Sequence, residues 1–277
     1  MDWPLASGPA LLESWTTWAT ATGSATAHTK GAWAQLTSAT SRTVTGVWLG
    51  IFDTYATSTN TSTLLDLGAG AAGSETVVLS NLEVGYRGSN VGITRFFVPI
   101  RLPAGVRVAA RVQSAQTSKA VNLAVSAETG IPPAGLTSAM VVDTVGTVAG
   151  SSRGTTVTSS ATANTPGSWV ELTASSARRA TSVLLSMGAN GSTAANLGAF
   201  TGNVDLGIGA AGSEAVLRTA RATGMGWDTI LDAKEPPGLV LPWEGLHIPA
   251  GTRVAARMAS SVTGTFSLDV SAHLFTF

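Results

Sequence analysis

Short runs in which apolar and polar residues alternate recur along most of the chain. In the segment 107–111, both arginines fall on one face of a strand, while Val108 and Ala110 fall on the other. Further short runs, several of them rich in β-branched residues, lie at 43–48, 121–125, 181–185 and 266–270. Turn signals containing proline and glycine at 103–105 and 249–251 separate neighbouring runs. The pattern predicts a chain of short β-strands joined by tight turns.

About seven or eight such strands in roughly 120 residues favour an antiparallel β-sandwich, with a jelly roll as the leading version. The segment 9–18 departs from this pattern, because four of its apolar residues are spaced to share one face of a helix. These residues are Leu11, Leu12, Trp15 and Trp18. We expect a short N-terminal arm here, either a helix outside the repeat or a first strand, whose apolar residues anchor the chain to a partner.

Three blocks of sequence occur twice, in the same order. Nine of fourteen positions match in the first block, ten of thirteen in the second and eight of ten in the third. The paired blocks are 24–37 with 160–173, 65–77 with 204–216, and 102–111 with 248–257. Their offsets of 136, 139 and 146 residues are too long for a solenoid and indicate two homologous domains that differ by short loop insertions.

The repeat sets the expected domain boundaries. The N-terminal arm or first strand occupies 1–23, and the first β-sandwich occupies 24–130. The linker and the start of the second domain occupy 131–159, and the second β-sandwich occupies 160–277. A run rich in proline and glycine marks the junction.

Charge is scarce in this chain of 277 residues. Charged residues make up 12%, the net charge is zero, and 44% of residues are hydrophobic. Such a chain can bury a sizeable core, and it lacks the basic surplus expected of a nucleic-acid binder. It has no cysteine and no run of 18 apolar residues, so we expect neither disulfides nor a membrane span. Because monomers usually carry a well-charged surface, the scarcity suggests that other subunits cover much of this one.

The few charged residues shared by both copies are the main candidates for chemistry. The acidic ones are Asp66 and Glu75 with their counterparts Asp205 and Glu214, and the basic ones are Arg107 and Arg111 with their counterparts Arg253 and Arg257. We expect structural pairs in which a glutamate and an arginine fix a glycine-rich loop to the sheet. Two alternatives stay open: calcium binding by the four carboxylates, and glycoside hydrolysis by a carboxylate pair.

Two matches to catalytic motifs lack the structural context that their chemistry needs. The segments 68–73 and 207–212 read GxGxxG, but strand-like residues follow the first where a dinucleotide site needs a helix. The segment 150–154 reads GxSxG and is also followed by β-branched residues. The histidines, His28, His247 and His273, are scattered, and we expect them at the surface or at strand ends. The sequence therefore predicts no catalytic residue and no cofactor.

Four of the eight tryptophans fall into two further groups. Trp33 and Trp169 match across the repeat, which favours a core or inter-sheet position. Trp227 and Trp243 lie in the longer loops of the second unit, where indole rings could stack on sugars or anchor a protein interface. We favour subunit interfaces and keep glycan contact as the alternative.

The block D-L-G-x-G-A-A-G-S-E, followed by P-A-G-x-R-V-A-A-R, resembles accessory virion proteins of tailed bacteriophages and related gene transfer agents. The resemblance covers residues 24–127 and 160–272. It implies a β-sandwich component of the virion, with head decoration, head fibre and tail appendage as candidates and other virion proteins as partners. It implies no enzyme activity.

These observations predict a structural virion component, displayed on the head or tail surface, that acts by subunit assembly and binding. Tandem copies suit a homo-oligomer, and we favour a trimer because three chains would present six similar domains. The alternative is a carbohydrate-binding appendage that contacts glycans of the host surface.

Overall fold

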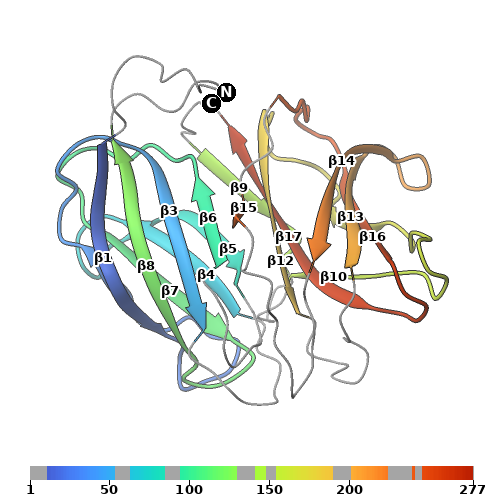
Figure 1. The fold of residues 1–277 in the computed structure, drawn as a ribbon. Helices are drawn as coiled ribbons and strands as arrows, with labels where there is room; N and C mark the ends of the chain where they lie inside the picture. Colours follow the sequence, from blue (N-terminus) through green and yellow to red (C-terminus); the bar gives the residue numbers. More distant parts are fainter. Residues whose placement is uncertain are drawn as a thin grey trace, which may run out of the picture.

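The structure is a computed structural model in which residues 11–53, 63–84, 94–129, 141–147, 154–189, 201–223, 239–240 and 245–276 are described. Every regular element in these ranges is a β-strand, so they contain no helix long and apolar enough to cross a membrane. The strands form two units that lie side by side (Figure 1). The expected class, an all-β chain of two tandem antiparallel sandwiches, is confirmed.

The first unit has the strand order of an eight-stranded jelly roll. One antiparallel sheet runs β1-β8-β3-β6, and the other runs β2-β7-β4-β5. The strands are β1 (Leu11–Thr22), β2 (Ala34–Thr37), β3 (Val44–Asp53), β4 (Thr63–Ala69), β5 (Thr76–Glu83), β6 (Thr94–Val98), β7 (Val108–Ser114) and β8 (Ala120–Thr129). β15 (Leu239–Val240), which comes from the second half of the chain, pairs in parallel with β6 and extends the first sheet.

The second unit repeats this order in its described strands. One sheet runs β10-β17-β12, with β9 also paired to β17, and the other runs β11-β16-β13-β14. The strands are β9 (Val141–Val145), β10 (Thr155–Thr158), β11 (Val170–Thr173), β12 (Ser182–Ala189), β13 (Thr201–Ile208), β14 (Ala215–Thr223), β16 (Val254–Ser260) and β17 (Ser267–Thr276). The registers also agree: Asp66 pairs with Arg111, and Asp205 pairs with Arg257 at the equivalent position.

Each unit buries an apolar core between its two sheets. In the first unit, alternate residues of β4 such as Leu65 and Leu67 face the core, as the period of two predicts. Two residues of the second unit, Leu184 on β12 and Phe275 on β17, belong to the first core and not to the second. The two jelly rolls are therefore joined by an apolar contact.

The N-terminal segment is a strand, so its interpretation as a helix is wrong. β1 pairs with β8, with register shifts between Ser14 and Thr16 and between Thr16 and Ala19. A β-bulge inserts a residue and breaks the period of two. Two bulges in one strand gave the apolar residues a spacing close to that of a helix.

β1 also has a counterpart, although the sequence indicated that this segment lies outside the repeat. The equivalent cross-strand pairs are Thr22 with Ala120 and Thr158 with Ser267 at one end, and Leu11 with Thr129 and Val141 with Thr276 at the other. The offset is 136 residues at the first end (158 less 22) and 130 at the second (141 less 11). β1 therefore corresponds to β9 and β10 together, with six residues inserted between them.

Candidate functional site

The glutamates and arginines of the repeat pair with each other across the sheet surface. The Arg107 guanidinium hydrogen-bonds to the Glu75 carboxylate, and Arg253 Nη1 lies 2.6 Å from Glu214 Oε1. Both glutamate side chains are almost fully buried. A glycine with a φ of +81°, a conformation that strains any residue with a Cβ, stands two residues before each glutamate. Each pair therefore fixes its glycine-rich loop to the neighbouring strand.

The surroundings of these two glutamates favour the ionised form. Burial raises the pKa of Glu75, but hydrogen bonds from its own amide, from Arg107 and from the amide of Gly73 outweigh burial and lower the pKa below its usual value. The pKa of Glu214 is lowered by the equivalent groups of the second unit. A carboxylate held ionised by an arginine is a poor proton donor, so this geometry does not favour the glycoside hydrolysis alternative.

Asp66 binds an arginine that stacks on a tryptophan. Arg111 Nε donates to Asp66 Oδ2 at 2.9 Å, and its guanidinium carbon lies 4.4 Å from the ring centroid of Trp33. The second unit repeats this arrangement at 2.9 and 4.5 Å with Asp205, Arg257 and Trp169. Both tryptophans are half-buried on the outer side of the sheet, where they cover Gly68 and Gly207. The core position expected for them is therefore wrong.

A lysine enters this cluster in the first unit only. Lys30 Nζ lies 2.7 Å from Asp66 Oδ1, while Pro166 stands at the equivalent position of the second unit. There the hydroxyl of Thr219 donates to Asp205 Oδ1 at 2.7 Å. Because cationic side chains already bind the Asp66 carboxylate, the geometry favours structural pairing over calcium binding. The described ranges hold no group of three or more His, Asp or Glu that could bind a metal ion.

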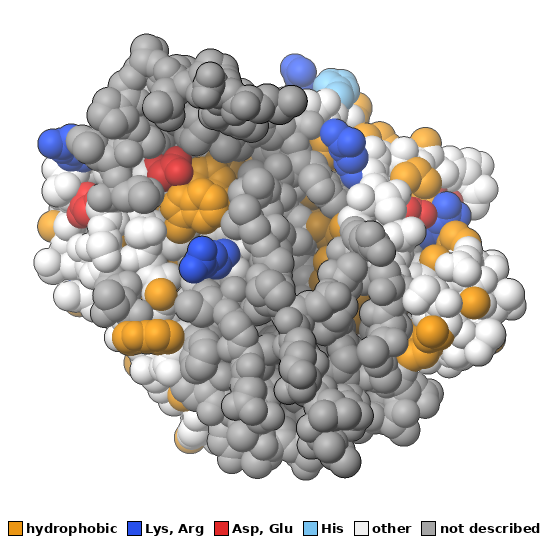
Figure 2. Space-filling model, in the orientation of Figure 1, with side chains coloured by type: hydrophobic (Ala, Val, Ile, Leu, Met, Phe, Trp, Pro, Cys, Tyr) orange, Lys and Arg blue, Asp and Glu red, His pale blue; other side chains and the backbone are white. Residues whose placement is uncertain are grey.

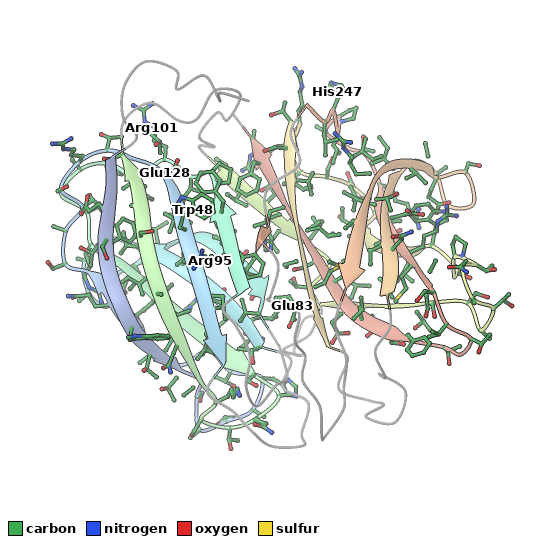
Figure 3. All side chains as sticks on the ribbon, viewed as in Figure 1. Trp48, Glu83, Arg95, Arg101, Glu128 and His247 are labelled. Carbon is green, nitrogen blue, oxygen red and sulfur yellow. The ribbon has the colours of Figure 1, made fainter. Side chains whose placement is uncertain are left out.

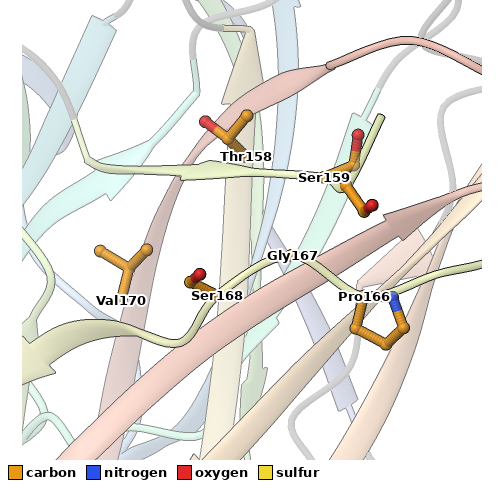
Figure 4. Close-up of a pocket in the computed structure, with 7 residues that line it drawn as sticks. Thr158, Ser159, Pro166, Gly167, Ser168 and Val170 are labelled. Atoms are coloured by element: carbon orange, nitrogen blue, oxygen red, sulfur yellow. The ribbon is translucent and has the colours of Figure 1, made fainter. Parts of the chain in front are cut away.

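An open depression lies where Pro166 replaces the lysine (Figure 4). It is lined by Thr158, Ser159, Ser160, Pro166, Gly167, Ser168 and Val170. Gly167 is required there, because a Cβ would lie 2.0 Å from the carbonyl oxygen of Thr158. The lining offers hydroxyl groups and no charged group, so it does not specify a ligand.

The contact between the units buries the outer face of the sheet formed by β9, β17 and β12. This sheet packs on β5, the edge strand of the first unit (Figure 1). The amide of Glu83 donates to the hydroxyl of Ser186 at 3.2 Å, and the hydroxyl of Thr144 donates to the carbonyl of Ser80 at 2.8 Å. Gly188 lies so close to Glu83 that a Cβ would be 2.2 Å from the carboxylate oxygen. A sheet face of one unit thus docks on an edge strand of the other.

His273 is fully buried in this contact, so its expected surface or strand-end position is wrong. Its Nδ1 lies 3.0 Å from the hydroxyl of Thr144, and its Nε2 lies 3.2 Å from the hydroxyl of Ser186. Since Thr144 donates its only hydroxyl proton to Ser80, Nδ1 carries the imidazole proton and Nε2 accepts from Ser186. Burial lowers the pKa of His273 to about 3. The pair of Ser186 and His273 is therefore a neutral part of the interface, closed to any substrate.

The equivalent face of the first unit is only partly exposed and carries different chemistry. Trp48 is half-buried, whereas Phe97 and Glu128 are 1% and 7% exposed. Trp48 on β3 packs against Phe97 on β6, with ring centroids 4.7 Å apart, and its indole Nε1 donates to Glu128 Oε1 at 2.9 Å. Arg95 is exposed beside them. It pairs with Gly50, two residues beyond Trp48 on β3, so it lies on the same face of the sheet. Figure 3 labels Trp48, Glu128 and Arg95 on this face, and Figure 2 shows hydrophobic atoms there between an acidic and a basic patch. We call Trp48, Glu128, Phe97 and Arg95 the indole face.

The remaining candidate residues are not brought together. Trp15 packs against the first core, whereas the side chain of Trp18 is 57% exposed, so the expected common face does not form. Leu11 and Leu12 lie in β1, paired with Thr129 and Glu128. The glycan candidates Trp227 and Trp243 lie outside the described residues, as does most of the GxSxG segment. His28 and His247 are exposed, as expected.

The indole face was missed because none of its residues falls in a repeated block. An extension of the first offset of 136 residues pairs Trp48 with Leu184. The change from leucine to tryptophan between two otherwise similar strands could have indicated that the two faces have different roles. Extension of the third offset of 146 residues would pair Glu128 with Leu274, so the equivalence of Glu128 with Phe275 emerges only from the strand registers of the structure.

No protein-family model matches this chain, and no curated protein matches it. Among solved structures, the chain is similar to the N-terminal CBM22-1-CBM22-2 tandem domain from Paenibacillus barcinonensis Xyn10C. The identity is 11%, the match covers 96% of this chain and 97% of that one, and the TM-score is 0.25. So low a TM-score supports no conclusion about fold or ligand, and the jelly-roll assignment rests on the strand order.

Proposed function

We propose that this chain is a non-catalytic assembly subunit that acts by binding other subunits. The observation that carries the proposal is the contact between its two units. The outer sheet face of one jelly roll docks on the edge strand of the other and buries Leu184, Phe275 and His273. Face-to-edge docking is therefore a binding mode that this kind of unit already uses, and it needs only apolar and neutral polar side chains.

The engagement of the recurring charges supports the same function. Glu75 and Asp66, like their counterparts, are bound by arginines of the same unit and fix loops to sheets. Charge that is used inside each unit leaves a surface with little net charge, and such a surface suits contact with other protein subunits.

Within this proposal the chain is displayed on the head or tail surface of a phage-like particle, as its sequence resemblance implies. Its partners are other virion proteins and further copies of itself. We favour a trimer, in which three chains present six jelly rolls around one axis.

Sedimentation velocity of the full chain over a range of concentrations tests the assembly function. We expect a species heavier than the 28.0 kDa monomer. A reconstruction of a particle that contains the chain tests its location, and we expect six jelly rolls per trimer on the outer surface. A monomer at every concentration, together with a particle in which the chain contacts no other subunit, would overturn the proposal.

Glycan binding is a second candidate, and the indole face favours it. The half-buried ring of Trp48 lies next to a carboxylate and near an exposed guanidinium, and these are groups that stack on sugar rings and hydrogen-bond to their hydroxyls. Calorimetric titration with a panel of oligosaccharides tests it, with Trp48→Ala as the variant and Trp18→Ala, an exposed tryptophan elsewhere, as the control. Binding lost only in Trp48→Ala is the expected result. No binding at high sugar concentration, or binding that survives in Trp48→Ala, contradicts this function.

A further inference from the structure

The indole face of the first unit is the structural equivalent of the docking face of the second. Trp48 pairs with Ser126 across β3 and β8, and Leu184 pairs with His273 across β12 and β17 at the same register. In the same way, Glu128 stands at the position of Phe275. In the second unit these positions are buried against the first unit, with Leu184 and Phe275 both inaccessible to solvent.

The surface that receives the docking face also has an equivalent. β5 receives it in the first unit, and β14 stands at the same edge of the second unit. Leu79 pairs with Leu67 on β4, and Arg218 pairs with Leu206 on β13 at the matching position. Leu79 is fully buried in the cluster that contains Leu184 and Phe275, whereas Arg218 is exposed. Val216 on the same edge strand is also 47% exposed.

The chemistry changes on both surfaces in a matched way. Inside the chain, Leu184 and Phe275 belong to the same apolar cluster as Leu79, and their strands β12 and β17 contact β5. At the equivalent positions, an indole ring and a carboxylate stand on the face, and a guanidinium stands on the edge. Arginine binds carboxylates by charged hydrogen bonds and stacks on indole rings, so the two altered surfaces are complementary. Glu128 is 7% exposed and its buried Oε2 has no hydrogen-bond partner, so a guanidinium that reaches this carboxylate would satisfy a buried acceptor.

We propose that the indole face of one copy docks on the β14 edge of a second copy, with Arg218 of the second copy bound to Glu128 and stacked on Trp48. This inference rests on the proposed assembly function and names the surfaces that perform it. Because the two surfaces differ, the contact is heterologous, and each chain carries one of each kind. Repeated docking therefore gives a closed ring, such as a trimer of six jelly rolls, or an open filament.

Charge reversal at each surface tests the docking by sedimentation velocity. The variants are Arg218→Glu and Glu128→Arg, the control is Arg179→Glu at an exposed position off both surfaces, and circular dichroism confirms folding. We expect each variant to weaken self-association by about tenfold or more, as loss of a desolvated charge pair does, and the control to leave it unchanged. Arg218→Glu lies on an exposed edge and keeps the test valid if Glu128→Arg fails to fold.

Combination of the variants identifies the contact. A chain with Arg218→Glu retains an intact indole face, and a chain with Glu128→Arg retains an intact β14 edge. A mixture of the two should associate as alternating chains, because the wild-type charge pair forms at one contact and the reversed pair at the next. The double variant should recover association for the same reason. If both single variants associate as tightly as the wild type, this docking is overturned and the assembly function stays in place. A wild-type chain that never self-associates overturns the docking and removes the self-assembly part of the proposed function.

Discussion

The amide of Glu83 in the first jelly roll donates to the hydroxyl of Ser186 in the second at 3.2 Å. This bond joins an edge strand to the face of a sheet, so the edge of the first unit is covered by its neighbour in the same chain. Exposed edges invite further pairing, and covering them is one way in which proteins prevent aggregation. The equivalent edge of the second unit, β14, has exposed side chains, and this asymmetry is the basis of the assembly proposed above.

Substitution of Gly188 should weaken the joint between the units. A Cβ at this position would lie 2.2 Å from Glu83 Oε1 and 2.6 Å from its Cγ, and Glu83 is fully buried. We expect Gly188→Ala to lower the free energy of unfolding by about 1–3 kcal/mol, the usual cost of overpacking. Denaturant unfolding measures this change. Gly23→Ala is the control, because its Cβ would meet neighbours at ordinary contact distances, and an equal loss in both variants would contradict the prediction.

Burial of His273 should make the stability depend on pH. Its folded pKa of about 3 lies below the unfolded value of about 6.5, so the unfolded chain binds more protons between these limits. The contribution of the neutral imidazole to the free energy of unfolding is complete above about pH 6.5. It falls by up to about 1.4 kcal/mol per pH unit as the pH drops toward 3. Denaturant unfolding from pH 7 to pH 4 should show a shallower decline in His273→Gln than in the wild type. His247→Gln, at an exposed position, is the control.

Glu75 and Glu214 should contribute in a lower pH range. Their folded pKa values are lowered, so the stability that they provide is present above the unfolded value of about 4.3 and is lost as the pH falls through the folded values. The double variant with Glu75→Gln and Glu214→Gln should be less stable than the wild type at pH 6, and the difference should shrink toward pH 3. Because arginines bind both carboxylates, added calcium should leave the melting temperature of the wild type unchanged. A rise with calcium would restore the metal hypothesis.

The duplication and the β-sandwich class could be predicted from the sequence, because the repeated blocks contain the residues that fix each loop and register. The expected pairing of glutamate with arginine forms in both units, whereas the pairing of Asp66 with Arg111 and of Asp205 with Arg257 was not predicted and comes from the strand registers. The course of β1 could not be predicted, because two β-bulges hide its alternation.

The candidate site was less accessible to prediction, since it depends on which surfaces the second unit covers. His273 alternates with apolar neighbours like an ordinary strand residue, and only the packing of one unit on the other buries it. The sequence also gives Trp48 and Leu184 the same strand position, but one is half-exposed and the other fully buried. Long-range packing decides this difference, and a local pattern carries no record of it.

The two aspartate clusters should differ in strength although they are equivalent. Asp66 has a side chain only 4% exposed and binds both Lys30 and Arg111, whereas the side chain of Asp205 is 15% exposed and binds one arginine. Removal of one partner from a buried ion pair costs more than removal from a solvated one. We expect Asp66→Asn to cost about 3 kcal/mol and Asp205→Asn about 1 kcal/mol in unfolding free energy. Equal losses would mean that the lysine adds nothing to the first cluster.

Trp48 and Leu184 occupy equivalent positions on the two faces, and exchange of these residues should affect folding and assembly differently. Leu184 is fully buried between the units, so Leu184→Trp must displace packed neighbours and should cost about 3 kcal/mol. Trp48→Leu removes the indole donor of the buried Glu128 carboxylate and should cost about 2 kcal/mol. In sedimentation, however, Trp48→Leu should weaken self-association, because the indole ring is the surface on which Arg218 stacks. A Trp48→Leu chain that associates as tightly as the wild type would show that the ring has no part in the contact.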